Sequence, residues 1–364
     1  MTEPFEIYLV ATPGLELPLC VEAREAGFDA KVVDGGVSFE GGWPDVWRAN
    51  LALRGATRVL ARIDSFRAMH LAQLDKRARK VNWATVLRSD VPVKVEASCK
   101  RSRIYHAGAA NQRVAKAISE ELGAPVTDDA AVRIMVRIED DLVTISVDTT
   151  GESLHKRGFK EGIAKAPMRE TMAAMFLRQC GYDGTQTVLD PMCGSGTFVI
   201  EAAEWALGLK PGRERAFAFE HLRGFDNQAW AAMRAPAAPR QIATKFIGFD
   251  RDPGAIRLAR ENAERAGVSR WVQFEGQSIE MLQAPDTAPG IVIVNPPYGT
   301  RIGNKTPLRE LYRTLGTVIR SRFAGWQFGL ITADKDLAAA TGLKLQLTEP
   351  TVLHGGLRVG LWQR

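Results

Sequence analysis

The stretch Asn295-Pro-Pro-Tyr298 combines side chains that could hold the amino group of a nucleobase. The Asn295 amide oxygen and the Pro296 carbonyl are hydrogen-bond acceptors for the two amine hydrogens. Pro296 and Pro297 stiffen the loop because each ring fixes φ at about −65°, and Tyr298 offers a flat face on which a base can stack. Because an amine conjugated to a purine is a poor nucleophile, these residues suit the positioning of that amine toward an electrophilic methyl group.

The loop follows a segment that predicts a buried strand. Residues 291 to 294 are four consecutive β-branched residues, a run typical of a strand covered on both faces. Ligands in open α/β sheets bind at the carboxyl ends of the strands, which is where Asn295 stands. Taken alone, the tetrapeptide is also compatible with a simple strand-ending turn, so its interpretation depends on the elements around it.

A glycine-rich turn precedes this segment in the chain. Residues 187 to 207 predict a strand, the turn Pro-Met-Cys-Gly-Ser-Gly ending at Gly196, and then a helix. Glycine lets the backbone approach a ligand closely, and a helix N-terminus favours a carboxylate. A second strand over 245 to 250 ends in Asp250, where an acid commonly binds the two hydroxyls of a ribose. The end of a third strand, over 272 to 278, could flank an adenine ring.

The remaining elements complete an alternating pattern of strands and helices. Helices are predicted at 168–177, 253–266 and 307–323, a strand at 328–332, and an antiparallel pair at 344–348 and 358–362 around Gly355-Gly356. A polar insertion rich in Ala, Pro and Arg, at about 208–242, indicates no clear element. The pattern predicts an α/β fold with a Rossmann-like, doubly wound sheet and an antiparallel edge.

Two small α+β units are predicted in front of this sheet. The order strand, helix, strand, strand, helix, strand over residues 5–66 is that of a ferredoxin-like unit. The second unit contains a strand at 91–98, a helix at 111–122, and a hairpin that joins 132–138 to 142–148. His155 follows with no partner at metal-ligand spacing, and we interpret it as a surface or hydrogen-bonding residue.

The positive charge of the chain is concentrated in these units. The net charge is +6, yet residues 51 to 116 contain 15 Lys or Arg and 4 Asp or Glu, a local excess of 11 positive charges. Such a stretch is the expected footprint of phosphate contact, although a solvated surface is the alternative. Basic residues interleaved with an aromatic suit RNA, and the candidates are Arg77, Lys80, Lys100, Arg101, Arg103 and Tyr105.

Composition predicts a cytoplasmic protein without membrane contact or a metal site. No apolar run approaches the roughly 18 residues of a membrane span, and the N-terminus lacks a signal-peptide pattern. The four cysteines are far apart with no CxxC pair, which argues against zinc and disulfides. Cys193 could be a nucleophile, as in cytosine-C5 methylases, but its place in the glycine turn argues against that role.

Taken together, these motifs resemble the THUMP domain-containing class I S-adenosylmethionine-dependent RNA methyltransferases. The similarity rests on Asp190-Pro-Met-Cys-Gly-Ser-Gly196, Asn295-Pro-Pro-Tyr298, the connector at 151–158 and the helix start Ala166-Pro-Met-Arg-Glu-Thr171. It covers nearly the whole chain, and it is greatest for the RlmL-type guanine-N2 methyltransferases of 23S ribosomal RNA. The resemblance implies a ferredoxin-like domain at 1–65, an RNA-binding THUMP domain at 66–158 and a methyltransferase domain at 159–364. Unlike the fused bacterial versions, this chain carries one methyltransferase domain, which implies one modification.

The resemblance also implies roles for individual residues. Asn295, Pro296, Pro297 and Tyr298 would hold the target amine, and Asn295 would also touch the cofactor. The family commonly has an acid near Gln277 and Ser278, so the chain departs from the family pattern there. The implied S-adenosylmethionine contacts are Thr171, Asp190, Pro191, Cys193, Gly194, Gly196, Asp250, Gln277 and Ser278.

The expected activity is methyl transfer from S-adenosylmethionine to guanine N2 in RNA, with 23S ribosomal RNA as the substrate and a monomer as the favoured state. Guanine-N2 methylation of transfer RNA and adenine-N6 methylation remain alternatives, because both amines offer the same donors to the loop. A non-catalytic RNA-binding assembly factor with a retired methylase domain is the alternative from a different class.

Overall fold

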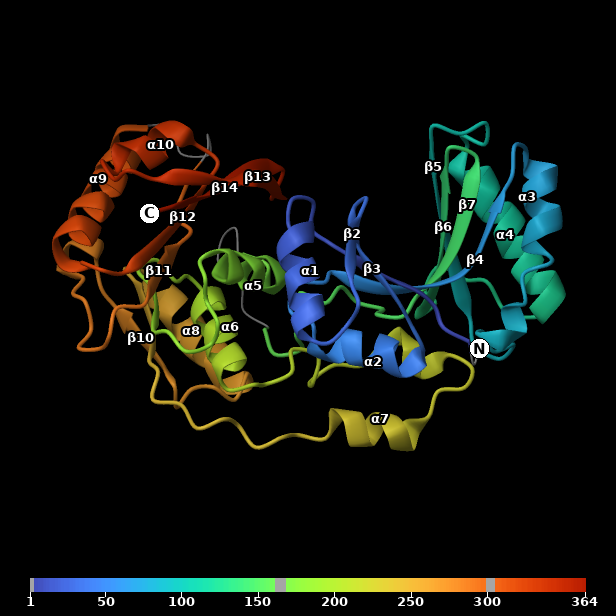
Figure 1. Cartoon of the computed structure of the whole chain (residues 1–364), viewed down its shortest axis with the longest axis horizontal. Coiled ribbons are helices and arrows are strands. Elements are labelled where there is room, and N and C mark those ends of the chain that lie inside the picture. Colours follow the sequence, from blue (N-terminus) through green and yellow to red (C-terminus); the bar gives the residue numbers. More distant parts are fainter. Residues whose placement is uncertain (1–2, 161–167, 299–304) are drawn as a thin grey trace. The chain divides into compact units, whose positions relative to one another are not determined.

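The structure is a computed structural model, and it describes residues 3–160, 168–298 and 305–364. The chain divides into two compact units (Figure 1). Unit 1 comprises Met1–Ala11, Glu22–Leu154 and Arg215–Pro236, and unit 2 comprises Thr12–Val21, His155–Glu214 and Ala237–Arg364. Each unit is therefore built from three separate stretches of the sequence.

The first half of unit 1 has the predicted ferredoxin-like order. Helix α2 starts with Pro44 in its first turn, a position where the missing N–H costs nothing. The hairpin turn at Asp34-Gly35 is also confirmed, with Gly35 at a φ of +73°. The elements are β1 (Phe5–Val10), α1 (Glu16–Glu25), β2 (Lys31–Val33), β3 (Gly36–Gly41), α2 (Trp43–Ala52) and β4 (Arg58–Arg67), and α1 spans the division between the units.

The second half of unit 1 continues the same sheet. The strand order is β2-β3-β1-β4-β7-β6-β5, and β4 pairs with β1 on one side and β7 on the other. The predicted boundary at residue 65 therefore falls inside a strand. The elements of this half are α3 (Leu71–Ala78), η1 (Trp83–Thr85), β5 (Val93–Lys100), α4 (Ala107–Leu122), β6 (Val132–Glu139) and β7 (Leu142–Asp148).

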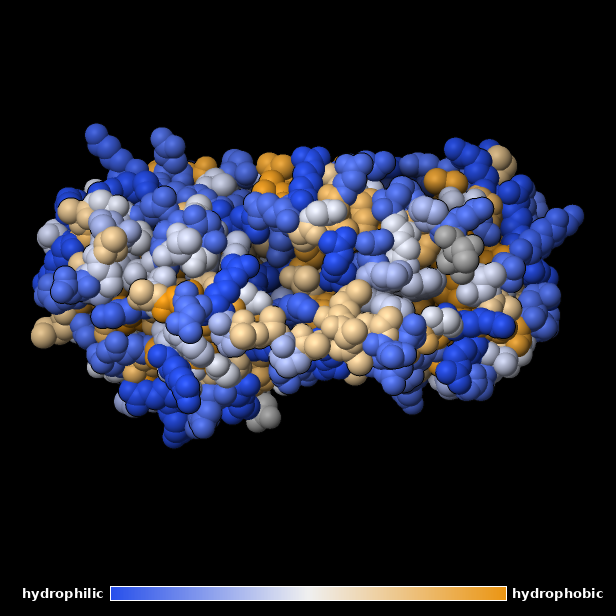
Figure 2. Space-filling model, turned by 60° about the horizontal axis from the view of Figure 1, so that its bottom comes forward, coloured by the Kyte–Doolittle hydropathy of each residue, from blue (hydrophilic) through white to orange (hydrophobic). Residues whose placement is uncertain are grey.

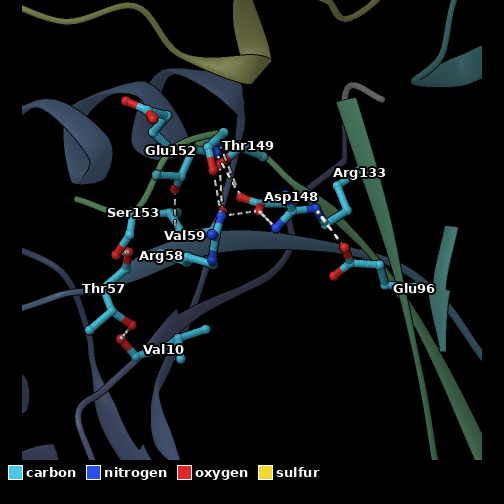
Figure 3. Close-up of polar contacts among 12 residues, drawn as sticks. Val10, Thr57, Arg58, Val59, Glu96, Arg133, Asp148, Thr149, Glu152 and Ser153 are labelled. Carbon is cyan, nitrogen blue, oxygen red and sulfur yellow. Dashed lines mark hydrogen bonds and ion pairs between the residues drawn. The ribbon is translucent and has the colours of Figure 1, made fainter. Parts of the chain in front are cut away.

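A buried carboxylate lies at the centre of this sheet (Figure 3). Asp148 is fully buried at the end of β7, and its Oδ1 accepts a hydrogen bond from the Thr150 N–H at 3.0 Å. Its Oδ2 pairs with Arg58 of β4 and lies 3.8 Å from the Arg133 Nη1 of β6. Burial raises the pKa of Asp148, and the charges of Arg58 and Arg133 oppose that rise, so this carboxyl group joins β4 to β6 and β7 through its two arginine partners.

The insertion at 208–242 has structure that its composition did not predict. Its central part contains η2 (Ala218–His221) and α7 (Asn227–Arg234) and belongs to unit 1. The Phe219 ring stacks on Trp47 of α2 at 6.0 Å between centroids and meets the edge of Trp230 at 5.0 Å. Arg215 Nη1 donates to the Ser153 carbonyl at 2.9 Å. We call residues 215–236 the returning segment, because it leaves the methyltransferase sequence to pack on unit 1.

Unit 2 contains the doubly wound sheet. The order is β10-β9-β8-β11-β12-β14-β13, parallel from β10 to β12 and antiparallel at β14 and β13. Helices α5, α6 and α8 cover one face, and α9 and α10 the other (Figure 1). The elements are α5 (Glu170–Gln179), β8 (Val188–Asp190), α6 (Thr197–Ala206), β9 (Phe246–Asp250), α8 (Pro253–Arg265), β10 (Val272–Gly276), η3 (Ile279–Met281), β11 (Ile291–Val294), α9 (Lys305–Arg322), β12 (Gln327–Thr332), α10 (Lys335–Ala340), β13 (Gln346–His354) and β14 (Leu357–Gln363).

The core of unit 2 follows from the periodicity of its sequence. All four residues of β11 are buried, as expected for a strand covered on both faces. Leu308, Tyr312, Leu315 and Ile319 of α9 recur at helical spacing and pack on that strand. Within the described part of the chain, no helix is long and apolar enough to cross a membrane. Hydrophilic side chains predominate on the face shown in Figure 2.

Candidate cofactor and base site

The carboxyl ends of the parallel strands in unit 2 bring the predicted site residues to one edge of the sheet. The chain runs from β8 to β9 and β10 on one side, and β11 then pairs with the other side of β8. In open α/β sheets, ligands bind outside the carboxyl ends of the strands at such a reversal of strand order, here at β8 and β11. Asp190 ends β8, Asp250 ends β9 and Asn295 directly follows β11. The structure therefore brings these three predicted residues to the same edge of the sheet.

The glycine turn after β8 is fixed by backbone geometry. Gly194 and Gly196 have φ values of +52° and +86°, the left-handed region that favours glycine. A Cβ added to Gly196 would lie 2.8 Å from Cζ of Phe274, so there is no room for a side chain. The Cys193 N–H donates to the Phe249 carbonyl at 2.8 Å, which ties the turn to β9. The turn thus presents backbone at the N-terminus of α6, where a carboxylate is stabilised.

Asp250 connects the glycine turn to the end of β9. Its Oδ2 accepts from the Gly194 N–H at 3.0 Å, and its Oδ1 accepts from the Asp252 N–H at 3.0 Å. A carboxylate has about four lone-pair sites, so each oxygen keeps capacity for another donor. The side chain is only half-buried. These features fit the predicted contact with the two ribose hydroxyls.

The predicted adenine side lies beside Asp250. The Gln277 N–H donates to the Asp250 carbonyl at 3.0 Å, which extends the pairing of β10 with β9. Ser278 precedes η3, and Glu280 lies within that turn. A backbone N–H and the Ser278 hydroxyl lower the pKa of Glu280, so its carboxylate is ionised. Glu280 supplies an acid in this region, and the sequence analysis missed it because it looked at positions 277 and 278.

Asp190 is a buried carboxyl at the end of β8. It is 2% exposed, and its Oδ1 accepts from the Met192 N–H at 3.0 Å, while Pro191 is buried next to it. Burial raises the pKa of Asp190 to about 8, and the charge of Asp250 adds to the rise. A cation bound nearby would offset this cost, so the site fits the ammonium group at the methionine end of S-adenosylmethionine.

The start of α5 lies next to the start of α6. Lys160 Nζ is 2.8 Å from Glu170 Oε1 and 2.9 Å from Thr197 Oγ1, so one side chain bridges the first residues of both helices. Thr171 follows Glu170, and its buried hydroxyl has no hydrogen-bond partner among the described residues. That unsatisfied group fits the predicted contact with the cofactor.

The Asn-Pro-Pro-Tyr loop has the properties that base positioning requires. The Asn295 Oδ1 is buried and has no hydrogen-bond partner within the part of the chain that the structure describes. Pro296 is buried, and Tyr298 is half-buried against the core of unit 2. Burial raises the pKa of Tyr298 to about 12, so its ring stays neutral. An amide oxygen without a partner is costly unless a ligand donor satisfies it.

Tyr312 of α9 supports the loop, and the sequence analysis did not single it out. Its fully buried side chain donates its hydroxyl to the Pro297 carbonyl at 3.3 Å, with Thr332 Oγ1 at 3.4 Å. Burial raises its pKa, so the hydroxyl remains protonated and able to donate. Helical periodicity marks this tyrosine only as a core residue, and no local signal indicates a partner 15 residues away.

Cys193 has the environment of a structural cysteine. It is buried, and burial together with the charges of Asp190 and Asp250 raises its pKa well above the usual range. A thiol in this environment stays protonated and is a poor nucleophile. Among the described residues, no group of three or more His, Cys, Asp or Glu is arranged to hold a metal ion.

The predicted RNA contacts in unit 1 fall into two groups. Lys100, Arg101 and Arg103 lie at the end of β5 and form ion pairs with the acidic residues at the tip of the β6–β7 hairpin, Glu139, Asp140 and Asp141. Arg101 lowers the pKa of Asp140. The local excess of positive charge is therefore partly cancelled by acids outside the 51–116 window.

The second group keeps its charge available. Arg77 and Lys80 are exposed at the end of α3 and just beyond it, and they form no ion pair among the residues that the structure describes. Tyr105 is 84% exposed, which is unusual for an aromatic side chain. These three residues suit contact with a phosphate backbone and a base better than the paired group does.

This combination of sheet order, glycine turn, acid at the end of β9 and Asn-Pro-Pro-Tyr loop is that of a class I S-adenosylmethionine-dependent methyltransferase. Residues 157–358 match the family described as RMKL-like, methyltransferase domain, residues 6–60 match the RlmL ferredoxin-like domain, and residues 68–148 match the THUMP domain. The chain therefore belongs to the RMKL-like methyltransferase family, with RlmL-type ferredoxin-like and THUMP domains in front of the methyltransferase domain.

Individual relatives agree with this assignment. The ribosomal RNA large subunit methyltransferases K/L of Syntrophotalea carbinolica and Vibrio campbellii are 34% and 30% identical, over 94% and 96% of this chain. The chain spans about half the length of these curated relatives, 51% and 52%.

Solved structures match over nearly their full length. SMU.472, a putative methyltransferase complexed with SAH, has a TM-score of 0.90 at 28% identity and covers 100% of this chain and 98% of its own. A predicted N6-adenine-specific DNA methylase from Listeria monocytogenes has a TM-score of 0.88 at 30% identity, with 99% and 96% covered. The predicted fold and cofactor are thus confirmed, whereas the roles of individual site residues stay predictions.

We expect cofactor binding at pH 7 to release a proton from Asp190. Its carboxyl is largely protonated below a pH of about 8 in the free protein, and a bound ammonium group favours the ionised form. Affinity should therefore fall as pH drops, by at most about tenfold per pH unit. Calorimetry of S-adenosylhomocysteine binding in buffers of different ionisation enthalpy counts the protons. Asp190→Asn is the matched control, and equal proton release from both proteins would show that Asp190 does not face the ammonium.

Loss of the Tyr312 hydroxyl should slow catalysis without weakening cofactor binding. A hydrogen bond of this kind contributes about 1 kcal/mol, so Tyr312→Phe should lower kcat by about fivefold as the loop loses its support. Single-turnover methyl transfer measures the effect, and S-adenosylhomocysteine binding is the internal control. An unchanged kcat with a lower melting temperature would show that Tyr312 stabilises only the core.

Proposed function

We propose that this chain transfers a methyl group from S-adenosylmethionine to the exocyclic N2 amine of a guanine in large-subunit ribosomal RNA. The observation that supports the reaction type is the buried Asn295 Oδ1, which lacks a partner among the described residues and stands at the carboxyl end of β11. The names of the curated relatives support ribosomal RNA as the substrate.

The residues of the loop would do most of their work by positioning. S-adenosylmethionine supplies a methyl group on a sulfonium, which is already a strong electrophile. The Asn295 oxygen and the Pro296 carbonyl would accept the two amine hydrogens, and Tyr298 would stack on the base. Holding the amine in line with the methyl group removes much of the entropic cost of the reaction. Because a base inside a helix cannot reach this loop, the target must be unpaired or flipped out.

The N-terminal unit would select the RNA. THUMP and ferredoxin-like domains precede the methyltransferase domain, and the unit presents exposed cations with Tyr105. Phosphate contacts fix the position of a protein on RNA, and unpaired bases stack on aromatic side chains. We infer that unit 1 holds the RNA while one base enters the site of unit 2.

Adenine N6 is the second candidate for the target amine. A Listeria monocytogenes structure at 30% identity is described as a predicted N6-adenine-specific DNA methylase. Two acceptors in the loop bind either amine equally well, so the loop does not select between the bases. The discrimination must come from contacts to the other edges of the base.

Nucleoside mass spectrometry of separated ribosomal and transfer RNA, from cells with and without this gene, tests the proposal. Loss of one N2-methylguanosine from large-subunit RNA is the expected result. Loss of N2-methylguanosine from transfer RNA would show that the reaction is the proposed one but that the substrate is transfer RNA. Loss of N6-methyladenosine would show that the target base is adenine. An unchanged set of methylated nucleosides in RNA would contradict the proposal.

The unpaired cations of α3 should matter more for RNA binding than the paired ones of β5. Arg77→Glu with Lys80→Glu should weaken RNA binding and reduce its dependence on salt, because each lost contact with single-stranded phosphate removes about 0.7 from the slope of log K against log salt. Lys100→Glu should have a smaller effect, since Lys100 already lies 3.2 Å from Glu139. Filter binding over a range of salt concentrations measures the affinity and the salt slope of each variant. Equal slopes for all variants would show that these residues do not contact RNA phosphates.

A further inference from the structure

The hairpin of β13 and β14 projects toward the ligand-binding edge of unit 2. Gly360 of β14 is paired with Thr332, the last residue of the parallel strand β12, so residues 357–359 extend beyond the carboxyl ends of the parallel strands. Asn295 lies at the same edge. Gly355 and Gly356 have φ values of +57° and +84°, as in a two-residue type I′ turn. The hairpin tip, residues 353–358, is therefore a defined projection next to the base site.

The hairpin tip exposes two leucines that the core does not need. Leu353 is 53% exposed and Leu357 is 45% exposed, whereas the next pair inward, Val352 and Val359, is buried. Leu353 is paired with Arg358, and Leu357 is paired with His354. Paired residues of a hairpin point to the same face, so each face of the tip carries one leucine and one basic residue.

Arg169, which directly precedes α5, lies near the hairpin tip. Burial lowers the pKa of His354, and the charge of Arg169 lowers it further. The pKa of His155 falls to about 4 through burial and then through Arg169, Arg157, Lys156 and Lys160. Arg169 therefore lies near both imidazoles. Arg169 and Arg358 are exposed and form no ion pair among the described residues.

We propose that Arg169 and Arg358, with Leu353 and Leu357, form an RNA-contacting surface around the two faces of the hairpin tip, on the methyltransferase domain itself. An RNA strand matches this surface because it presents phosphates to the cations and apolar base faces to the leucines. The surface would hold the nucleotides that flank the target base, so that the base reaches Asn295. This inference rests on the proposed function and adds the element that guides the strand.

Two double variants test the two halves of this surface. Arg169→Gln with Arg358→Gln should reduce the salt slope of RNA binding by about 1.4, because each contact with single-stranded phosphate contributes about 0.7. Leu353→Ser with Leu357→Ser should lower kcat/KM for RNA by about tenfold or more, as expected when a base loses a packing partner. The RNA is large-subunit ribosomal RNA from cells that lack this gene, and S-adenosylhomocysteine binding should be unchanged in both variants.

Matched controls separate contact from folding. Arg257→Gln removes another exposed arginine, whose side chain is 74% accessible on α8, and should leave the salt slope and kcat/KM unchanged. Arg169→Lys with Arg358→Lys keeps both charges and should restore the salt slope. A glutamine variant that loses S-adenosylhomocysteine binding, or a lysine variant that does not restore the slope, would show that the arginines are structural and would overturn the inference.

The outcomes also distinguish this inference from the proposed function. If the wild-type protein methylates no RNA, the proposed function is contradicted. The RNA-contacting surface is still tested in that case, because the salt slope of RNA binding can be compared between the wild type and the arginine variant. A wild-type protein that methylates RNA, with slopes and kcat/KM unchanged in both double variants, contradicts only the inference. If the variants lose binding or kcat/KM with assembled ribosomal particles but not with free RNA, a ribosomal protein contacts the hairpin tip. That result would also overturn the inference.

Discussion

Asn295→Ala should lower kcat by about a thousandfold and leave cofactor affinity nearly unchanged. The side chain supplies one of the two acceptors that orient the amine, and correct orientation of the reacting groups accounts for several kcal/mol of the barrier. Its Oδ1 is buried and lacks a partner among the described residues, so truncation removes no hydrogen bond that this oxygen makes to them. The fold should therefore survive. Single-turnover incorporation of tritiated methyl groups measures the chemical step.

Asn295→Asp is the matched control for this prediction. A carboxylate keeps the acceptor oxygens in the same place, so part of the activity should remain, whereas alanine should leave almost none. Calorimetry with S-adenosylhomocysteine checks that the cofactor still binds to both variants. Full turnover by the alanine variant would contradict the positioning of the base by the loop. Loss of cofactor binding in that variant would show that Asn295 acts mainly in binding the cofactor.

Gly196→Ala should abolish cofactor binding. At a φ of +86° an alanine costs about 1–2 kcal/mol in backbone strain alone. Its Cβ would also lie 2.8 Å from Phe274 Cζ and 3.2 Å from the Ala259 Cβ, and overpacking of this kind costs about 1–3 kcal/mol more. The turn must shift to relieve the clash, which displaces the start of α6. Affinity for S-adenosylhomocysteine should fall by at least about a hundredfold, as calorimetry would show.

Two further variants check the physical cause. Gly42→Ala changes a glycine whose added Cβ would lie 3.7 Å from the Pro44 Cδ, an ordinary contact, so it should cost at most about 1 kcal/mol of stability and leave cofactor binding intact. Phe274→Leu in the Gly196→Ala background removes part of the ring that causes the clash and should recover some affinity. If Gly196→Ala binds the cofactor as tightly as the wild type does, the glycine turn does not bind the cofactor.

Local sequence signals predicted the framework of the site well. The four β-branched residues before Asn295 predicted β11, and the glycines ending at Gly196 predicted the turn and the helix after it. Each of these signals lies within the element that it predicts. Helix α4 begins at Ala107 rather than at the predicted residue 111, because His106 Nδ1 caps it by accepting from the Ala109 N–H at 3.0 Å. Histidine is not among the usual capping residues, so the pattern gave no sign of it.

Features that depend on distant contacts could not be predicted in this way. The support of Pro297 by Tyr312 requires knowledge of how α9 packs on the sheet. The charge excess of residues 51–116 was counted along the chain, whereas Glu139 and its neighbours approach Lys100 and Arg101 only in the folded sheet. Charge counted in a sequence window therefore overestimates the positive potential of unit 1.

The returning segment has a consequence for the order in which the protein is made. Unit 1 includes residues up to Leu154, yet residues 215–236, which cover Trp47, are synthesised later, with a stretch of the methyltransferase domain in between. The 82 residues from 155 to 236 take about 4–16 s at about 5–20 residues per second. During that interval the returning segment is not yet available to pack on Trp47. Unit 1 can thus be completed only after translation of unit 2 is under way.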